Sequence, residues 1–429
     1  MILKEKTLLV SVKQKTKKGG WPLADMQDEL EELVGACSAE ITDHVTCIYE
    51  KPTPNFFIGR GKAEEISFLS DELGVDSVIF GCDLSGTQQR NLENVISKKT
   101  IDRTQLILDI FARRARSPEG KMQVELAQLE YMLPRLIGKG IILSRLGGGI
   151  GTRGPGEQKL EVDRRTIRKR IEKLKQDLTH VSLHRAVMRK KRQEKAMPSI
   201  ALVGYTNAGK STLLNNLTGA SQFVSDSLFT TLDPLSKAAI LPDGEQVIVS
   251  DTVGFLHELP HHLIEAFKAT LEEVINSGLL LHVVDISHPK AYEYYSSVLG
   301  VLKDLGAGDK PVITVLNKVD LLEDKSWIER LKAEYFNPVV ISALKDQNIA
   351  GLLEMIEAHF SANMISAEVN LPLSRMDMVN LFYKEGKITD IIYHPNGIKI
   401  KLNLARNLFD KLMHDKELRK TIRISKKNN

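Results

Sequence analysis

The stretch that decides the fold is GYTNAGKS, residues 204–211. It matches the pattern G-x-x-x-x-G-K-[S/T], and it lies between a β-branched apolar run, Ile200–Val203, and a helix-like segment, STLLNNL. In this context the backbone N–H groups of the loop surround phosphate oxygens, and the positive end of the following helix favours an anion. We therefore predict a phosphate-binding loop in which Lys210 contacts the β- and γ-phosphates and Ser211 binds Mg²⁺. The alternative is a glycine-rich turn with a chance Lys-Ser pair.

Three further motifs follow in order, each at the end of a predicted strand. In DTVG, Asp251–Gly254, the carboxylate holds Mg²⁺ through water and the Gly254 N–H contacts the γ-phosphate. In NKVD, Asn317–Asp320, the aspartate accepts two hydrogen bonds from guanine, donors that adenine lacks. In SAL, Ser342–Leu344, the segment packs on the other edge of the base. Each motif alone is weak, but together they predict a GTP-binding domain with a doubly wound, mostly parallel sheet.

Hydrolysis requires further groups that the four motifs do not supply. Phe255 follows Gly254, where Ras-like enzymes carry a glutamine that orients the attacking water. A phenyl ring cannot do this, so we expect slow intrinsic hydrolysis, completed by another part of the chain, by K⁺ or by a partner. Asn207 occupies the position where cation-dependent relatives place a K⁺ ligand, so K⁺ stimulation is a hypothesis. The segment SLFTTLDPL offers Thr230 and Thr231 as switch threonines.

The pattern of strands and helices predicts an α/β protein of four parts. The first has strands at Lys6–Val12, His44–Glu50 and Asp76–Gly81 that alternate with helices. The second is an antiparallel pair of long helices with a glycine-rich tip at 144–160. The last contains a hairpin around Asn396–Gly397. The predicted parts are 1–101, an α/β domain; 102–197, the helical hairpin; 198–363, the GTP-binding domain; and 364–429, a small α+β domain.

Composition narrows the class of protein. The charge is uneven: 144–197 has 16 Lys and Arg against 6 Asp and Glu, whereas 198–365 has 11 against 21. Basic regions beside an acidic domain indicate a polyanionic partner. No apolar run approaches the roughly 20 residues that a membrane span needs. The three cysteines have no metal-site spacing, so we expect reduced thiols in a cytoplasmic protein, and we expect a monomer.

The glycine-rich stretch SRLGGGIGTRGPGEQKL, Ser144–Leu160, contains G-x-G-x-x-G. A dinucleotide site needs a short helix and a second strand after that turn, but about 35 residues of charged helix follow here. A flexible connection is one alternative. The other is RNA contact, because a slim backbone can approach a groove while arginines bind phosphate or stack on bases. The candidate RNA-binding residues are Arg145, Arg153, Lys159, Arg164, Arg165 and Arg168.

These motifs together resemble the HflX family of GTPases. The resemblance rests on LGGGIGTRGPGE, KLEVDRR, GYTNAGKSTL, TTLDP, DTVGF and NKVD, and it covers about residues 1–360. It implies a cytoplasmic GTPase that binds the large ribosomal subunit and its RNA, is stimulated by it, and splits stalled ribosomes under stress. It also implies that Thr231 completes the Mg²⁺ shell. ATP binding in the N-terminal region is reported for the family, but no phosphate loop occurs there in this sequence.

With the resemblance included, the predicted GTP contacts cover all four motifs and the switch segment. Ser211 and Thr231 are the predicted Mg²⁺ ligands, with Asp251 acting through water. The predicted GTP-binding residues are Gly204, Tyr205, Thr206, Asn207, Ala208, Gly209, Lys210, Ser211, Thr212, Phe229, Thr230, Thr231, Leu232, Asp233, Asp251, Thr252, Val253, Gly254, Asn317, Lys318, Val319, Asp320, Ser342, Ala343 and Leu344.

Three other functions use parts of the same pattern. A GTPase that assists large-subunit assembly needs the same residues. Depletion of such a protein would make precursor particles accumulate, whereas a splitting factor releases subunits from intact ribosomes. An RNA-binding regulator whose nucleotide only tunes affinity would show no GTP turnover, even with ribosomes. A nicotinamide-dependent oxidoreductase is the weakest alternative, and absence of NAD binding would exclude it.

Overall fold

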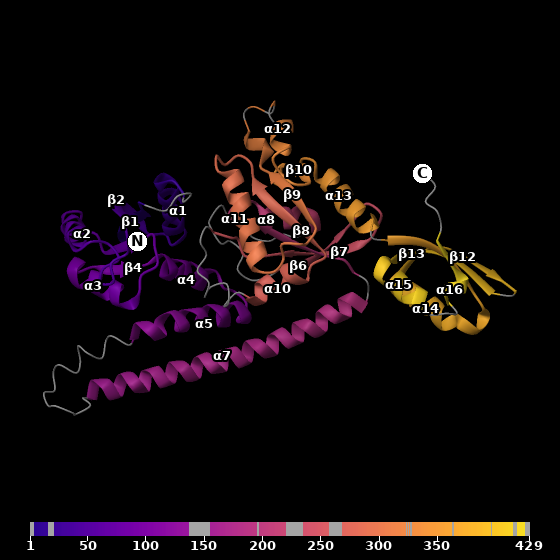
Figure 1. Ribbon diagram of the computed structural model, residues 1–429, viewed down its shortest axis with the longest axis horizontal. Coiled ribbons are helices and arrows are strands. Elements are labelled where there is room, and N and C mark those ends of the chain that lie inside the picture. The colour runs from indigo at the N-terminus through magenta and orange to yellow at the C-terminus, as the bar shows by residue number, and fades with distance from the viewer. Residues whose placement is uncertain are drawn as a thin grey trace. The chain divides into compact units, whose positions relative to one another are not determined.

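The computed structural model describes most of the chain, in two compact units. The described residues are 4–15, 21–136, 155–194, 197–219, 235–256, 268–322, 324, 326, 328–362, 364–395, 397–414 and 418–424. One unit comprises Met1–Val181, Phe223–Pro234 and Thr252–Glu272, and the other comprises Ser182–Gln222, Leu235–Asp251 and Glu273–Asn429. The described residues form three separate sheets, with four, six and four strands (Figure 1). No helix within these ranges has the length and hydrophobicity that crossing a bilayer requires.

The first sheet is parallel, with strand order β2-β1-β3-β4. Its strands are β1 (Lys6–Gln14), β2 (Glu40–Tyr49), β3 (Ser77–Phe80) and β4 (Lys99–Ile101). The connecting helices are α1 (Leu23–Ala36), α2 (Arg60–Glu72), α3 (Gly86–Ile96) and α4 (Arg103–Arg114). The sequence did not predict β4, because three residues between two helices are too few to show the alternation of a strand.

Successive side chains of β1 point to opposite faces of the first sheet, and most of them are buried. Leu8, Val10 and Val12 pack with Ile66 and Leu92, which lie on α2 and α3. The helices α1 and α4 contact each other, and α4 contacts β3. Apolar side chains therefore leave both faces of β1, as a parallel sheet covered by helices on both faces requires.

A helical hairpin follows, formed by α5 (Pro118–Arg135) and α7 (Pro155–Glu194), which lie side by side and antiparallel (Figure 1). Leu126 on α5 packs with Ile171 and Leu174 on α7. Two ion pairs also join the helices, Glu125–Arg170 and Glu130–Lys175, both at 2.7 Å. Helix α7 begins at Pro155, within the predicted tip at 144–160, because proline is favourable in the first turn of a helix. Residues 144–154 of the predicted tip lie outside the described residues.

The six-stranded sheet has the order β10-β9-β8-β5-β7-β6. Its strands are β5 (Ser199–Gly204), β6 (Leu235–Ile240), β7 (Gln246–Asp251), β8 (Leu279–Asp285), β9 (Val312–Asn317) and β10 (Pro338–Val340). Five are parallel, and β6 pairs antiparallel with β7. The sequence missed β6, which lies at the edge of the sheet and is largely exposed, so it lacks a buried apolar run. The helices are α8 (Lys210–Thr218), α10 (Lys268–Asn276), α11 (Ala291–Asp304), α12 (Ile328–Lys332) and α13 (Ile349–Ala362).

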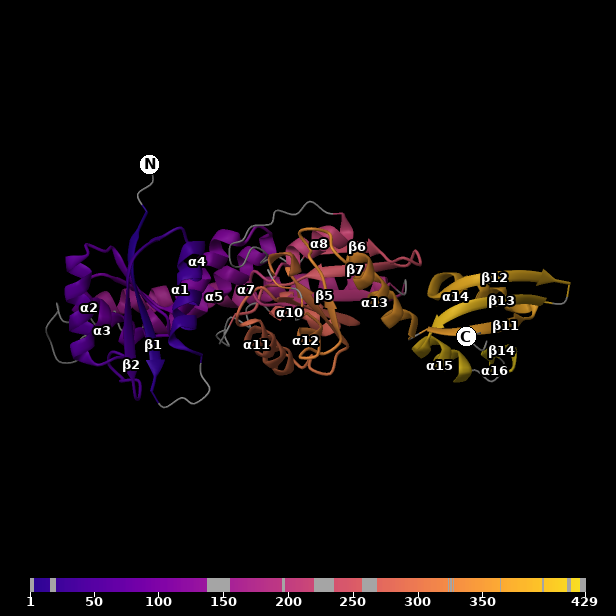
Figure 2. The ribbon, with the colours of Figure 1, turned by 90° about the horizontal axis from the view of Figure 1, so that it is seen from above.

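The C-terminal sheet is antiparallel, with strand order β12-β13-β11-β14 (Figure 2). The predicted hairpin joins β12 and β13, whose last pair is His394 with Gly397; Asn396 itself lies outside the described residues. The elements are β11 (Met364–Leu371), α14 (Met376–Glu385), β12 (Gly386–His394), β13 (Gly397–Ala405), α15 (Arg406–His414), α16 (Leu418–Thr421) and β14 (Ile422–Ile424).

Candidate nucleotide-binding site

The phosphate loop leaves the carboxyl end of β5, a central strand between β7 and β8. Gly204 ends this strand with φ of 155°, and a Cβ there would overlap the carbonyl oxygen of Val283 on β8. The loop backbone therefore lies directly against β8, at a distance that no side chain permits. It runs through Tyr205–Gly209 into α8, so the N–H groups of the first helical turn face the same edge of the sheet as the loop.

The side chain of Lys210 is hydrogen-bonded to the backbone of the phosphate loop. It is buried, and its Nζ donates hydrogen bonds to the carbonyl oxygens of Gly204, at 3.0 Å, and Tyr205, at 2.8 Å. Burial lowers the pKa of Lys210 to about 8, although the nearby Asp251 carboxylate acts in the opposite direction. A bound phosphate group would add negative charge beside this buried ammonium group.

Ser211 and Asp251 meet below the loop. The Ser211 hydroxyl donates to Oδ2 of Asp251 at 2.7 Å, and both residues are buried. A hydroxyl and a carboxylate are hard oxygen donors of the kind that Mg²⁺ prefers, and Mg²⁺ in nucleotide sites takes few protein ligands together with phosphate oxygens. The residues therefore fit Mg²⁺ bound with a nucleotide.

The segment after Asp251 is buried throughout, from Thr252 to Leu256. Phe255 is 2% exposed. Its ring offers neither a hydrogen-bond donor nor an acceptor, so it cannot orient a water molecule. The predicted switch residues Phe229, Thr230, Thr231, Leu232 and Asp233 lie outside the described residues.

Asn317 connects three of the predicted motifs. Its Nδ2 donates to the carbonyl oxygen of Ala208 in the phosphate loop at 2.9 Å, and its Oδ1 accepts from the backbone N–H of Ala343 at 2.9 Å. Asn216 on α8 donates to the carbonyl oxygen of Ala343 at 3.2 Å. The phosphate loop, NKVD and SAL segments are thus joined by hydrogen bonds between residues 26 to 127 positions apart.

Asp320 carries an acceptor with no partner. Its Oδ1 is buried and makes no hydrogen bond within the described part of the chain. Beside it, Lys318 has φ of 66°, and its Nζ pairs with Oδ2 of Asp285 at 2.7 Å. On the SAL side, Ser342 is fully buried and its Oγ accepts from the N–H of Lys345 at 3.1 Å. An unsatisfied buried carboxylate oxygen is costly unless a ligand donates to it, as the guanine N–H groups can.

Two aromatic contacts near the loop were not predicted. The ring of Tyr205 stacks on Tyr294 of α11 with centroids 3.9 Å apart. His282, on β8, is buried and stacks on Tyr295 at 4.8 Å. Burial, and then the charge of Lys210, lower the pKa of His282 to about 3, so it is neutral near pH 7. No motif marks these contacts; the signal was a histidine inside the apolar run LLLHVVD.

The candidate RNA-binding residues are only partly described. Arg145 and Arg153 lie outside the described residues, and Lys159 is on α7 with no described side chain. Arg165 and Arg168 are exposed on α7 and have no ion-pair partner among the described residues, whereas Arg164 is half-buried and contacts Glu161 at 3.5 Å. The other face of this helix packs on α5.

Three family profiles match successive parts of the chain. They are described as GTP-binding GTPase N-terminal, over residues 24–112; GTP-binding GTPase Middle Region, over 114–192; and 50S ribosome-binding GTPase, over 199–318. The "GTPase HflX" of Caldanaerobacter subterraneus subsp. tengcongensis is 46% identical over 385 residues, which are 90% of this chain and 89% of that protein. This chain belongs to the HflX family of GTPases.

A second HflX GTPase, from Escherichia coli K12, is 41% identical over 363 residues, 84% of this chain and 85% of the relative. The HflX relationship and the GTPase domain make the chain a GTP-hydrolysing enzyme. Among solved structures, a GTP-binding protein from Sulfolobus solfataricus in complex with GDP is 27% identical and covers 82% of this chain and 98% of its own, with a TM-score of 0.42.

Proposed function

We propose that this HflX-family GTPase binds the large ribosomal subunit and couples GTP binding and hydrolysis to the splitting of stalled ribosomes under stress, acting as a monomer in the cytoplasm. The observation that carries the proposal is the pair of exposed arginines, Arg165 and Arg168, on the face of α7 that does not pack on α5. Without ion-pair partners in the described structure, they can bind RNA phosphates. The profile description "50S ribosome-binding GTPase" supports the same partner.

The nucleotide site supplies the switch in this proposal. Lys210 would bind the β- and γ-phosphates, and Ser211 would hold Mg²⁺, with Asp251 through water. When bound, Mg²⁺ would neutralise charge on the phosphate oxygens. Asp320 would accept from the guanine, and Asn317 would hold the loop and the SAL segment around it. None of these side chains orients the attacking water, so we propose that the ribosome completes the site.

The direct experiment is sedimentation with purified 30S, 50S and 70S particles, in GDP or a non-hydrolysable GTP analogue. We expect pelleting with 50S subunits in the GTP analogue and weak pelleting in GDP. Light scattering should report dissociation of 70S ribosomes. Absence of binding in both nucleotides would contradict the proposal, and accumulation of precursor particles on depletion, without 70S splitting, would favour an assembly function.

A matched pair of variants tests the arginines. Replacement of both Arg165 and Arg168 by Gln should weaken 50S binding at least tenfold and reduce its dependence on salt. The control replaces Lys121 and Lys173 by Gln, which removes the same charge from exposed positions farther from the glycine-rich stretch. Equal loss in both double variants would show that net charge, and not this face of α7, determines binding.

We also propose K⁺ as a second cation at the loop. Asn207 is exposed, with φ of 59°, so its amide oxygen is accessible at the edge of the phosphate loop. GTP turnover should be faster in K⁺ than in Na⁺, and Asn207→Ala should remove the difference between the two salts. Equal rates for the unmodified protein in the two salts would contradict the proposal.

A further inference from the structure

Asp102 directly follows β4 and caps the N-terminus of α4, and its fully buried carboxylate has several partners. It accepts hydrogen bonds from the backbone N–H of Leu84 (3.1 Å) and Gln105 (2.8 Å), from the Tyr131 hydroxyl (2.7 Å), and from Nη2 of Arg135 (2.9 Å). These partners come from the loop before α3, the first turn of α4 and the end of α5. We call these five residues the Asp102 cluster.

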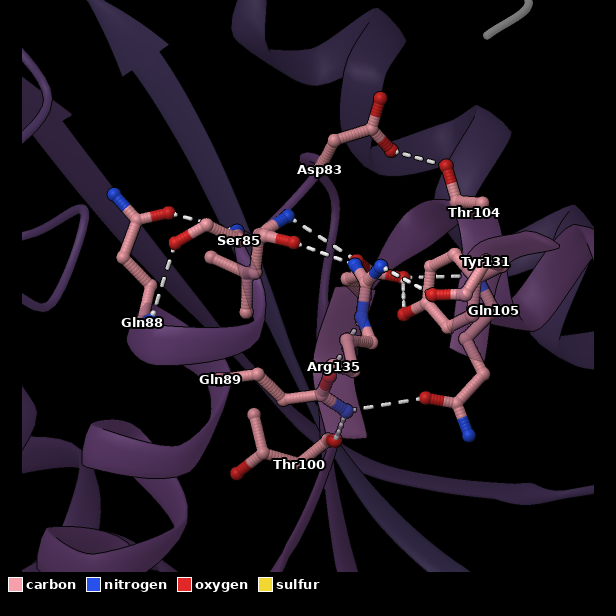
Figure 3. Close-up of polar contacts among 11 residues, drawn as sticks. Asp83, Ser85, Gln88, Gln89, Thr100, Thr104, Gln105, Tyr131 and Arg135 are labelled. Carbon is pink, nitrogen blue, oxygen red and sulfur yellow. Dashed lines mark hydrogen bonds and ion pairs between the residues drawn. The ribbon is translucent and has the colours of Figure 1, made fainter. Parts of the chain in front are cut away.

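Arg135, the last residue of α5, uses its whole guanidinium group in this cluster. Nη2 also donates to the carbonyl oxygen of Leu84 at 2.6 Å, Nη1 to that of Tyr131 at 3.0 Å, and Nε to Oε1 of Gln89 at 3.2 Å. The guanidinium carbon lies 3.3 Å from the centre of the Tyr131 ring. Figure 3 shows Arg135 between Tyr131 and Gln89. A planar group with five donors can make all these contacts together, whereas a lysine cannot.

The backbone of α5 also comes close to α3 here. At Gly86, the first residue of α3, a Cβ would lie 2.8 Å from Cγ and 3.0 Å from Cα of Arg135. Gln89, one turn later, donates to the carbonyl oxygen of Thr100 on β4 and to Oε1 of Gln105 on α4 (Figure 3). The end of α5 is therefore fixed to β4 and to both flanking helices, with no room for a side chain at Gly86.

The position of this attachment matters because Arg135 is the point where α5 ends and the chain continues toward the glycine-rich stretch. Along its length, α5 also packs on α7 through Leu126, Ile171 and Leu174. The first sheet and the hairpin are thus joined at the end of α5 that lies nearest in sequence to the predicted RNA-contacting tip.

We propose that the Asp102 cluster positions the hairpin on the first sheet, and that ribosome-dependent GTPase stimulation requires this position while nucleotide binding does not. Arg135 and Asp102 are then positioning residues that act through the placement of α5. The proposal rests on the function proposed above, and its test includes a measurement that does not involve ribosomes.

The test variant is Arg135→Met. Arg135 lines an open cavity of about 410 Å³, so a shorter apolar side chain leaves solvent-accessible space and no sealed void, and the domain should still fold. The matched control is Arg103→Met, which breaks the buried ion pair with Glu29 (3.2 Å) that joins α1 to α4 in the same domain. Thermal midpoints of both variants set an assay temperature at which each is folded.

At that temperature, GTP turnover without ribosomes should be unchanged in both variants. For Arg135→Met, the 50S concentration that gives half-maximal stimulation should rise at least tenfold, and for Arg103→Met less than twofold. Arg135→Lys, which keeps the charge beside Asp102, should restore part of the response. Wild-type stimulation in Arg135→Met, or equal losses in the Met variants, would overturn the proposal.

The ribosome-free measurement is the distance between spin labels, introduced without cysteine chemistry at Phe68 on α2 and Val162 on α7, both well exposed. Arg135→Met should broaden the distance distribution, and Arg103→Met should not. An unchanged distribution in Arg135→Met would overturn the positioning function, whatever the ribosome assays show. A broadened distribution in a protein that does not bind ribosomes would contradict the proposed function and the ribosome-dependent part of the inference.

Discussion

Asn317 holds Ala208 of the phosphate loop through a buried hydrogen bond of 2.9 Å from its Nδ2 to the alanine carbonyl oxygen. Its Oδ1 accepts from Ala343, so Asn317→Ala leaves two buried backbone groups unpaired. Each such group costs roughly 1–3 kcal/mol. We expect GDP affinity to fall at least tenfold by calorimetric titration. Asn337→Ala removes an exposed side-chain bond to Val312 and is the control; unchanged affinity in Asn317→Ala would contradict the assignment.

Asp320→Asn should change base preference. The buried Oδ1 of Asp320 is an acceptor for guanine N–H groups, and an amide replaces part of that acceptor with a donor. Affinity for GTP should fall by about 1–3 kcal/mol, roughly five- to 150-fold, while xanthosine triphosphate, which carries an oxygen at position 2, should bind better. Competition between the two nucleotides measures the ratio, and retained preference for guanine would count against the predicted site.

Nucleotide affinity should depend on pH through Lys210. Its pKa is lowered to about 8 by burial, and phosphate binding should raise it, because a negative charge stabilises the ammonium form. Binding therefore takes up a proton above pH 8 and not below it. By linkage, GDP affinity should be nearly constant from pH 6.5 to 7.5 and about tenfold weaker at pH 9. Lys210→Arg, which stays charged, is the control, and a flat profile in the unmodified protein would exclude this account.

Acid should destabilise the unit that contains the six-stranded sheet through His282. Its pKa is about 3 when folded and about 6.5 when unfolded, so the unfolded chain binds the proton between these values. The free energy of unfolding should fall by up to about 1.4 kcal/mol for each pH unit below 6.5. Denaturant unfolding measures the free energy of unfolding at pH 7 and at pH 5. The decrease between these two pH values should be about 2 kcal/mol smaller in His282→Gln than in the unmodified protein. The exposed His180→Gln is the control; equal differences in all three proteins would refute the prediction.

Local pattern was sufficient for the elements that bury a continuous apolar run. The strands β5, β7 and β9 were predicted because each is apolar and ends at a recognisable motif, and β8 because its sequence is an apolar run. By contrast, β4 has three residues and β6 is an exposed edge, so neither carries a periodic signal. The predicted boundaries between the four parts of the chain, at 101/102, 197/198 and 363/364, stay a prediction.

The same limit applies to the site. GYTNAGKS, DTVG, NKVD and SAL are contiguous motifs, so their residues could be named from the sequence. The Asn317–Ala208 bond, the stacking of Tyr205 on Tyr294 and the burial of His282 join distant segments, and only the packed sheet brings them together. Arg164 is half-buried and contacts Glu161 at 3.5 Å, and its predicted contact with RNA stays a prediction.

The contact between Gly204 and the Val283 carbonyl oxygen has a consequence for how such sequences can vary in evolution. An added methyl group at Gly204 would displace β8 relative to β5, and β8 carries His282 and Asp285 to the site. Substitution at this position therefore cannot be neutral, and no compensating change of one neighbouring side chain can rescue it, because the obstacle is backbone. Across functional homologues, position 204 should admit glycine alone, while the ring of Tyr205, which stacks on Tyr294, should change together with that residue.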